Sequence, residues 1–556
     1  MNRIATAEDL KSGYIKEGDL IIDAPTKIYP DGSKEVLYYF MPKQWPALRE
    51  GCTIWINGET LGYCSLIKFN NTAQDLTPWH ISSATIKNIP HTKVECAQLV
   101  CHGLKNLTID GVSETFKGLD GLNSNKFLTG NFGFHIRQKM FSGHGIAVSV
   151  LDGGSIEIKG FEVQYGFCGI RINGGDYDVT VDSVEISNGY IHDTGEGEGL
   201  YLGATHNPPV AKLNNLSISN LVIARTAAEA IQVQHLTGHS KIHNITAYAA
   251  DVRWLNEFQN YQDTGIQWVL GSGKHVLDSI ILDGYGSVGL HIFGSDQTPT
   301  RQGLDWASIT NVLFNDGAGV GINIHGSTTK GMLWMFKDII FRSFSNEYYE
   351  GTGIAKKDFV ISKHNGTDTI TFDNITTDST KSKIFESLDK ISITNAEHGA
   401  THLEAPEYVL TGFEGDTKKP KHWHQYYGGY FPASKSGTVK IRTVWKAGDV
   451  AIDCYDYHYC FYKCVQDHAA MVAPRESNFW IKLTWDENGI RSDREGWNSN
   501  AKQSYIPPDN FRLKADSMYK KLEMGIMVEE PVLKEVIYGK MRITTTPCGE
   551  YVSYLW

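Results

Sequence analysis

The chain has 556 residues, of which 41% are hydrophobic and 21% are charged, a composition typical of a folded protein long enough for one extended domain and smaller modules. Its formal net charge of −11 argues against nucleic acid as a partner, because phosphate binding requires an excess of Lys and Arg. No apolar run is long enough for a membrane span. No apolar stretch follows Met1, so we expect no secretory signal.

Residues 1–95 contain short strand-like runs, such as 19–22, 36–40 and 53–56, which are separated by turns. These runs do not follow the regular spacing of the next segment. We predict a small β-rich head that caps the neighbouring domain, because the open end of a stacked sheet needs cover.

Residues 96–415 repeat a short pattern: a small residue, an aliphatic residue, a variable residue and a second apolar residue. The copies begin at intervals of 24, 30, 31, 35, 24 and 32 residues, and runs of β-branched residues lie between them. This period predicts a solenoid whose stacked coils share one core. A β-propeller is the alternative, but its blades need about 40–50 residues. We predict an all-β protein built on a right-handed parallel β-helix, with copies at Gly145, Gly169, Gly199, Ala230, Gly265, Gly289 and Gly321.

The variable position of each copy should point away from the core, because side chains alternate along a strand. Neighbouring coils lie about 4.8 Å apart, so these residues predict a polar ladder along one face. The ladder is either an ordinary solvated strand face or a surface for sugars, which need many hydrogen bonds and a few aromatic platforms. Between Ala147 at one end and Asn323 at the other, the candidate substrate-binding residues are Arg171, Tyr201, Gln232, Gln267 and His291.

Glu198 and Glu229 directly precede the small residue in two successive copies. Stacked one coil apart, two carboxyl groups would raise the pKa of one of them, because close carboxylates cannot both ionise freely. A pair of carboxyl groups is what glycoside hydrolysis requires, and their separation decides the stereochemistry. We therefore predict Glu198 and Glu229 as the catalytic residues, provided that a bend turns them outward, since strict alternation would direct them into the core.

The longest interval, which precedes Gly265, places an insertion at 251–263 that holds Trp254 and Tyr261 among acidic and basic residues. Insertions in solenoids gather on the binding face. This segment therefore predicts either a sugar-acid subsite containing Trp254 and Tyr261 or a plain surface loop.

The repeats at 96–415 resemble right-handed β-helix proteins, namely pectate-lyase-like enzymes and phage tailspikes. The resemblance lies in the architecture, and no catalytic motif of either group accompanies it. It implies a polysaccharide as the partner.

Residues 416–500 are rich in aromatic residues and contain Gly448-Asp449-Val450, followed by a Tyr-x-Cys-x3-His spacing that begins at Tyr462. This order resembles the chitin-binding type of carbohydrate-binding module, family 5/12. The resemblance implies that sugars stack on flat aromatic faces; the alternative is that these aromatic residues form the core of a small β module. The residues concerned are Tyr459, Tyr462 and Trp480.

Cys454, Cys460 and Cys464 lie close in sequence but lack a clear fourth zinc ligand. We expect buried thiols or one local disulfide there, no metal, and no organic cofactor.

We predict that residues 501–556 form a C-terminal β segment. The segment 506–513 resembles the sequence with which many β-helix proteins end. The module at 416–500 is therefore either inserted before a last coil of the β-helix or followed by a separate C-terminal piece of the chain.

Three functions fit these features. The first is a tailspike-like receptor-binding protein of a phage tail, which binds or also depolymerises host-surface polysaccharide. It would assemble as a homotrimer, contact other tail proteins and lie outside the cell or on the virion. The second is a secreted polysaccharide lyase or glycoside hydrolase that acts on environmental polysaccharide. The third is a structural β-helix adhesin without catalysis.

Overall fold

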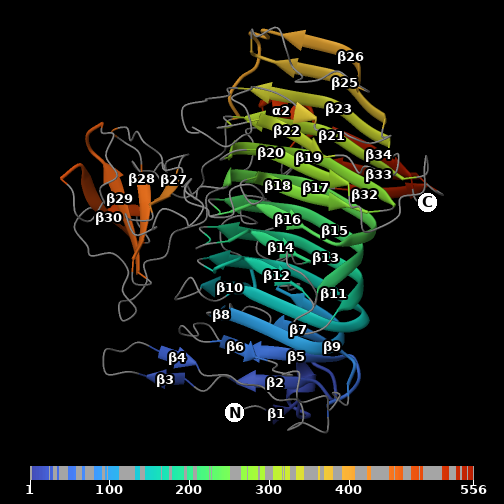
Figure 1. Ribbon diagram of the computed structural model, residues 1–556. Coiled ribbons are helices and arrows are strands. Elements are labelled where there is room, and N and C mark those ends of the chain that lie inside the picture. Colours follow the sequence, from blue (N-terminus) through green and yellow to red (C-terminus); the bar gives the residue numbers. More distant parts are fainter. Residues whose placement is uncertain are drawn as a thin grey trace.

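A computed structural model gives the fold of the protein (Figure 1). The residues that it describes are 3–23, 26–28, 34–36, 48–57, 65–68, 81–89, 94–96, 98–111, 132–137, 144–164, 166–173, 178–192, 194, 197–203, 210–224, 226, 228–250, 264–271, 273–285, 288–294, 305–315, 317, 320–325, 333–342, 361–362, 369–379, 391–406, 423–426, 447, 450–455, 458–467, 478–486, 489–491, 516–524, 534–538, 541–546 and 549–554.

Within this part of the chain, 24 strands join one sheet, in which each coil pairs in parallel with the next. The first strands are β1 (Arg3–Ile4), β2 (Leu20–Asp23), β5 (Cys52–Asn57), β6 (Ser65–Lys68), β7 (Ser83–Asn88), β8 (Val94–Cys96), β9 (Gln98–Asp110) and β10 (Phe134–Arg137). The long strands that follow are β11 (Ile146–Gln164), β13 (Val179–His192), β15 (Ala211–Ala224), β17 (Leu236–Ala250), β19 (Lys274–Tyr285), β21 (Trp306–Asn315), β23 (Leu333–Arg342), β25 (Thr369–Thr377) and β26 (Ile391–His398). The shorter strands between them are β12 (Ile170–Ile172), β14 (Leu200–Leu202), β16 (Ile231–Val233), β18 (Thr264–Leu270), β20 (Val288–Gly294), β22 (Val320–His325) and β24 (Ile361–Ser362).

The predicted parallel β-helix is confirmed: the coils stack from β2 at one end to β26 at the other (Figure 1). The inward positions of the repeat form its core. Ile170, Leu202, Ile231 and Ile292 are all completely buried on strands that pair in parallel. Each such side chain contributes about 1.5–3 kcal/mol by leaving water, so the repeat itself is the main source of stability.

The small residue of each copy lies where the next coil and the opposite strand approach most closely. A Cβ atom on Gly169 would lie 2.4 Å from Cγ2 of Ile191 and 2.5 Å from the carbonyl oxygen of Gly199. The same atom on Gly199 would lie 2.5 Å from Cγ2 of Ile223. Glycine is therefore required at positions 169 and 199 for space, because the backbone oxygen of the neighbouring coil cannot move away.

A stack of asparagines bends the long strands. Asn188, Asn220 and Asn244 all have a positive φ of 53–54°, a conformation that asparagine tolerates better than most residues. Nδ2 of Asn220 donates to Oδ1 of Asn188 at 3.3 Å, and Nδ2 of Asn244 donates to Oδ1 of Asn220 at 3.1 Å. Each amide thus holds the bend of the next coil in register.

The parallel stacking begins earlier in the chain than the spacing of the repeats predicts. Inside residues 1–95, which we expected to form a head, β2 pairs in parallel with β5, β5 with β7, and β7 with β9. These strands lack the small residue followed by an aliphatic residue that begins each copy of the repeat. The spacing of the repeat therefore does not predict them. β3 (Thr26–Ile28) and β4 (Lys34–Val36) form a separate hairpin.

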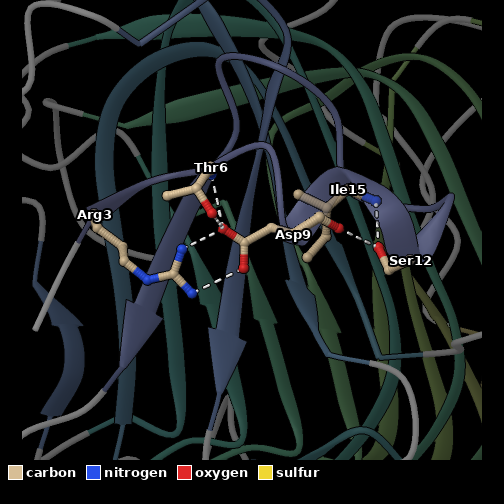
Figure 2. A network of polar contacts seen from close by, with 5 residues as sticks. All are labelled: Arg3, Thr6, Asp9, Ser12 and Ile15. Atoms are coloured by element: carbon tan, nitrogen blue, oxygen red, sulfur yellow. Dashed lines mark hydrogen bonds and ion pairs between the residues drawn. The ribbon is translucent and has the colours of Figure 1, made fainter.

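The N-terminal segment closes this end of the stack. β1 runs antiparallel to β2, and the short 3-10 helix η1 (Asp9–Ser12) follows. Figure 2 shows that the Asp9 carboxylate accepts hydrogen bonds from both terminal nitrogens of Arg3 and from the backbone N–H and hydroxyl of Thr6. The bonds from Arg3 hold the pKa of Asp9 well below its usual range. The segment therefore covers the edge of β2 that would otherwise be open.

The C-terminal part adds two small sheets. The first contains β27 (Trp423–Tyr426), β28 (Val450–Tyr455), β29 (His458–Cys464), β30 (Trp480–Asp486) and β31 (Gly489–Arg491). The second contains β32 (Lys534–Tyr538), β33 (Met541–Thr546) and β34 (Gly549–Tyr554).

Between these sheets in the sequence, helix α2 (Met518–Lys521) docks against the outer face of the long strands. Tyr519 and Met524 are buried there in one cluster with Ile281, Leu313 and Ile340. Among the described residues, no helix has the length and apolar composition that crossing a bilayer requires.

Candidate functional site

The predicted polar ladder exists as a continuous column of residues. Ala147 pairs with Arg171, Arg171 with Tyr201, and Tyr201 with Gln232 in the register of successive coils. The column continues from Gln232 through Gln267 and His291 to Asn323. One residue per coil therefore points from the same face, as the alternation of the repeat predicts.

Burial divides the ladder into a closed part and an open end. Gln232, Gln267, His291 and Asn323 are only 0–3% exposed, whereas Arg171 and Tyr201 are partly exposed. A ligand from solution therefore meets the ladder first at Arg171 and Tyr201. We call these two residues the open end.

Hydrogen bonds between side chains hold the closed part together. Nε2 of Gln232 donates to Oε1 of Gln267 at 2.6 Å, and the same oxygen accepts from Nε2 of Gln234 at 2.9 Å. Nδ2 of Asn323 lies 3.2 Å from Nε2 of His291. These bonds link the closed part from coil to coil, while Oε1 of Gln232 and Oδ1 of Asn323 are buried without a hydrogen-bond partner.

The position directly before each copy forms a second column beside the ladder. Its apolar members are buried but absent from the main hydrophobic core: Cys168 belongs to no part of that core, and Val288 and Val320 pack on each other in a cluster of their own. The chain therefore bends before the short strands and turns this position away from the core. The residues of this column are His144, Cys168, Glu198, Glu229, Thr264, Val288 and Val320.

Glu198 and Glu229, the predicted catalytic pair, are neighbours in this second column. The backbone N–H of Gly169 donates to the Glu198 carbonyl, and that of Gly199 donates to the Glu229 carbonyl, both at 2.9 Å. Both side chains are buried, at 4% and 0% exposed. Nε2 of Gln232 donates to Oε1 of Glu229 at 3.3 Å, so the Glu229 carboxyl group reaches the side of the ladder. The bend that the prediction required is present.

Cys168 occupies the same column one coil before Glu198. Its Sγ donates to Oε2 of Glu198 at 2.9 Å. Burial, together with the charge of Glu198, raises the pKa of this thiol well above its ordinary value. The sulfur therefore acts as a hydrogen-bond donor and not as a nucleophile, because nucleophilic attack requires the thiolate.

His144 begins the column and contacts the open end of the ladder. Nη1 of Arg171 lies 2.9 Å from Nε2 of His144. Burial and the charge of Arg171 lower the pKa of His144 to about 4, so the ring is neutral at pH 7 and its Nε2 accepts a hydrogen bond from the guanidinium. The ring of Phe167 meets His144 edge-on, with centroids 5.7 Å apart. These two contacts fix the place of Arg171.

The repeat marks the positions of His144 and Cys168 in this column, although neither residue is a carboxylate. Both residues precede a small residue of the repeat, at the same position as Glu198 and Glu229. Gln234 lies two residues after the ladder residue Gln232, directly after β16, and no repeat position marks it.

The remaining predicted site residues lie elsewhere. Trp254 and Tyr261 fall outside the described residues. In the module, Tyr459 pairs with Cys454 and Tyr462 with Ala451, and their side chains are likewise outside the description. Trp480 pairs with Cys464 and is 6% exposed, which places its ring in the core of the module and not on a sugar-binding surface.

A third polar group lies on the outer face of the long strands, apart from the ladder. Glu162 accepts from His192 Nε2 at 2.9 Å and lies 3.1 Å from His135 Nδ1, and all three residues are buried. The ring of His192 stacks on Tyr190, with centroids 4.2 Å apart. Hydrogen bonds from the two histidines outweigh burial and hold the pKa of Glu162 well below its ordinary value.

In the part of the chain that the structure describes, no group of three or more His, Cys, Asp or Glu residues is arranged to hold a metal ion. Comparison with known proteins assigns no family: no protein-family model matches the chain, and no curated protein sequence is significantly similar to it.

Proposed function

We propose that this protein binds a glycan at the open end of the ladder and serves as a tailspike-like receptor-binding protein. The observation that carries the proposal is the placement of Arg171 and Tyr201 on adjacent coils, in hydrogen-bonded register and partly exposed. A tyrosine ring offers a flat face for a sugar, and a guanidinium offers several donors in a fixed plane. The closed part of the ladder continues behind them as a hydrogen-bonded row.

The β-helix fold is compatible with this proposal without deciding it, because one fold hosts many functions. The module at 416–500 would supply a second point of attachment through its resemblance to chitin-binding modules. Two linked sites raise the overall affinity when both reach the same polymer. A phage tail, a homotrimer and contacts with other tail proteins belong to the same proposal.

Cleavage of the bound polysaccharide is a second candidate function. It is favoured by Glu229, whose carboxyl group lies within 3.3 Å of a ladder amide, and by Glu198 in the next coil. A polysaccharide lyase or glycoside hydrolase would use these groups to transfer protons. Because both carboxyl groups are buried, the substrate has to open a path to them.

The test is a binding screen of the full chain against immobilised host-surface and environmental polysaccharides, followed by an assay for released products. We expect saturable binding to at least one polysaccharide, and light scattering that gives the mass of a trimer. Binding without unsaturated products or new reducing ends supports the receptor-binding function. Release of products supports a polysaccharide lyase or glycoside hydrolase. A stable monomer favours the secreted enzyme over the tailspike-like protein. No binding to any polysaccharide contradicts the proposal and leaves the structural adhesin.

A further inference from the structure

Arg171 carries a charge for which the described residues offer no counter-charge. Its Nη1 bonds to His144, a neutral ring, and its Nε is buried without a hydrogen-bond partner. No carboxylate of the described residues lies within ion-pair distance of the guanidinium. An arginine stays protonated in proteins, so the open end of the ladder contains a partly buried positive charge that has no ion-pair partner among the described residues.

The surroundings of Arg171 do not neutralise this charge. The low pKa of His144 keeps that ring neutral at pH 7, and Cys168 keeps its proton. Glu198 accepts the hydrogen bond of Cys168. Withdrawing a charge from water without a partner is costly, so an anion that binds here gains more than it would at an exposed arginine.

The net charge of the whole chain restricts where an acidic ligand can bind. With a net charge of −11, the protein does not attract polyanions in general. An acidic ligand would therefore bind only where a local cation outweighs this repulsion. Arg171 is such a cation, and it lies one coil from the Tyr201 ring.

We infer that the glycan bound at the open end is acidic and that a sugar carboxylate, as in a uronic acid, pairs with Arg171. A carboxylate suits this position because it accepts two parallel N–H bonds from the planar guanidinium. The neighbouring Tyr201 ring would then receive the same sugar or the next one. This inference rests on the proposed glycan binding, and it adds the chemical class of the glycan.

The experiment compares each polysaccharide that binds with the same polymer after its carboxyl groups have been reduced to alcohols. We expect wild-type protein to bind the acidic form at least about tenfold more tightly, as the loss of one charge-assisted pair predicts. Arg171→Gln should weaken binding of the acidic form by a similar factor and binding of the reduced form by much less, because an alcohol accepts a weaker hydrogen bond from the guanidinium than a carboxylate does. Arg171→Lys keeps the positive charge but lacks the planar guanidinium. Its affinity for the acidic form should lie between those of wild type and Arg171→Gln.

Lys212→Gln is the matched control, because it removes one positive charge at an exposed position of β15; it should bind like wild type. Circular dichroism and thermal melting establish that each variant folds. Equal affinity for the acidic and reduced forms, or binding that follows sulfate esters instead of carboxylates, overturns the inference but leaves glycan binding intact. Absence of binding to every polymer removes both the inference and the proposed function.

Discussion

Gln232 and Glu229 lie three residues apart in one coil, and Nε2 of the Gln232 amide donates to Oε1 of the Glu229 carboxyl group at 3.3 Å. Gln232 is the outward residue of its strand, so Glu229, which precedes the strand, lies on the outer face as well. The same bend places His144, Cys168 and Glu198 beside the ladder. Two columns therefore share one face of the solenoid, and together they form the candidate site.

The first prediction concerns the two carboxyl groups. If the protein cleaves its glycan, Glu198→Gln and Glu229→Gln should each abolish product release while binding stays within about twofold of wild type, because glutamine keeps the shape but cannot transfer the proton. Unsaturated products, followed by absorbance, would indicate a lyase; reducing ends alone would indicate a hydrolase. If both variants cleave the glycan at the wild-type rate, the catalytic residues lie elsewhere, and the segment 251–263 is the next candidate.

The second prediction tests the asparagine stack. Asn220→Ala should lower the stability by about 2–4 kcal/mol, because it loses two hydrogen bonds of about 1 kcal/mol each and forces alanine into a left-handed conformation. Asn220→Gly should cost less, since glycine accepts the positive φ. The measurement is the midpoint of denaturant unfolding. Equal midpoints for the alanine variant and wild type would show that the stack contributes nothing.

Much of the fold was predictable from the sequence because each coil repeats the same physical requirement. The inward aliphatic positions, the small residue and the outward ladder follow from strand alternation and stacking. The open and closed parts of the ladder were not predictable, since Gln232 and Tyr201 occupy the same repeat position and differ only in what covers them. The outward turn of Glu229 depends on a bend that alternation alone does not give.

The third prediction is a dependence of stability on pH. Burial lowers the pKa of His275 from 6.5 to about 4. Between these values the unfolded chain binds a proton and the folded chain does not, so stability falls as the pH drops from 6.5 towards 4. From pH 7 to pH 5 this residue should cost about 2 kcal/mol.

His275→Gln removes this titration, and the variant should lose about 2 kcal/mol less than wild type between pH 7 and pH 5. Its stability at pH 7 should be lower, because His275 lies 2.9 Å from the Ser240 hydroxyl and bonds to the Gly271 carbonyl. His144 should behave in the same way, since its pKa is also lowered to about 4. An identical pH slope in the variant and wild type would contradict the assignment.

The fourth prediction concerns the docking of helix α2. Tyr519 is completely buried, and its hydroxyl donates to the Glu404 carbonyl at 2.5 Å. Tyr519→Ala should cost about 3–5 kcal/mol locally and release residues 516–524, which limited proteolysis would then cut while the β-helix stays intact. Tyr519→Phe keeps the ring and should lose only about 1 kcal/mol. Equal protease resistance of the alanine variant would show that this contact does not hold the segment.

The most direct measurement of the central claim is the affinity of the bound polysaccharide for Tyr201→Ala, compared with wild type and with Tyr14→Ala, an exposed tyrosine near the N-terminus. Loss of a stacking platform at the open end of the ladder should weaken binding by about tenfold, while the Tyr14 variant should bind like wild type. If Tyr201→Ala is folded and binds with undiminished affinity, the ladder is not the glycan site.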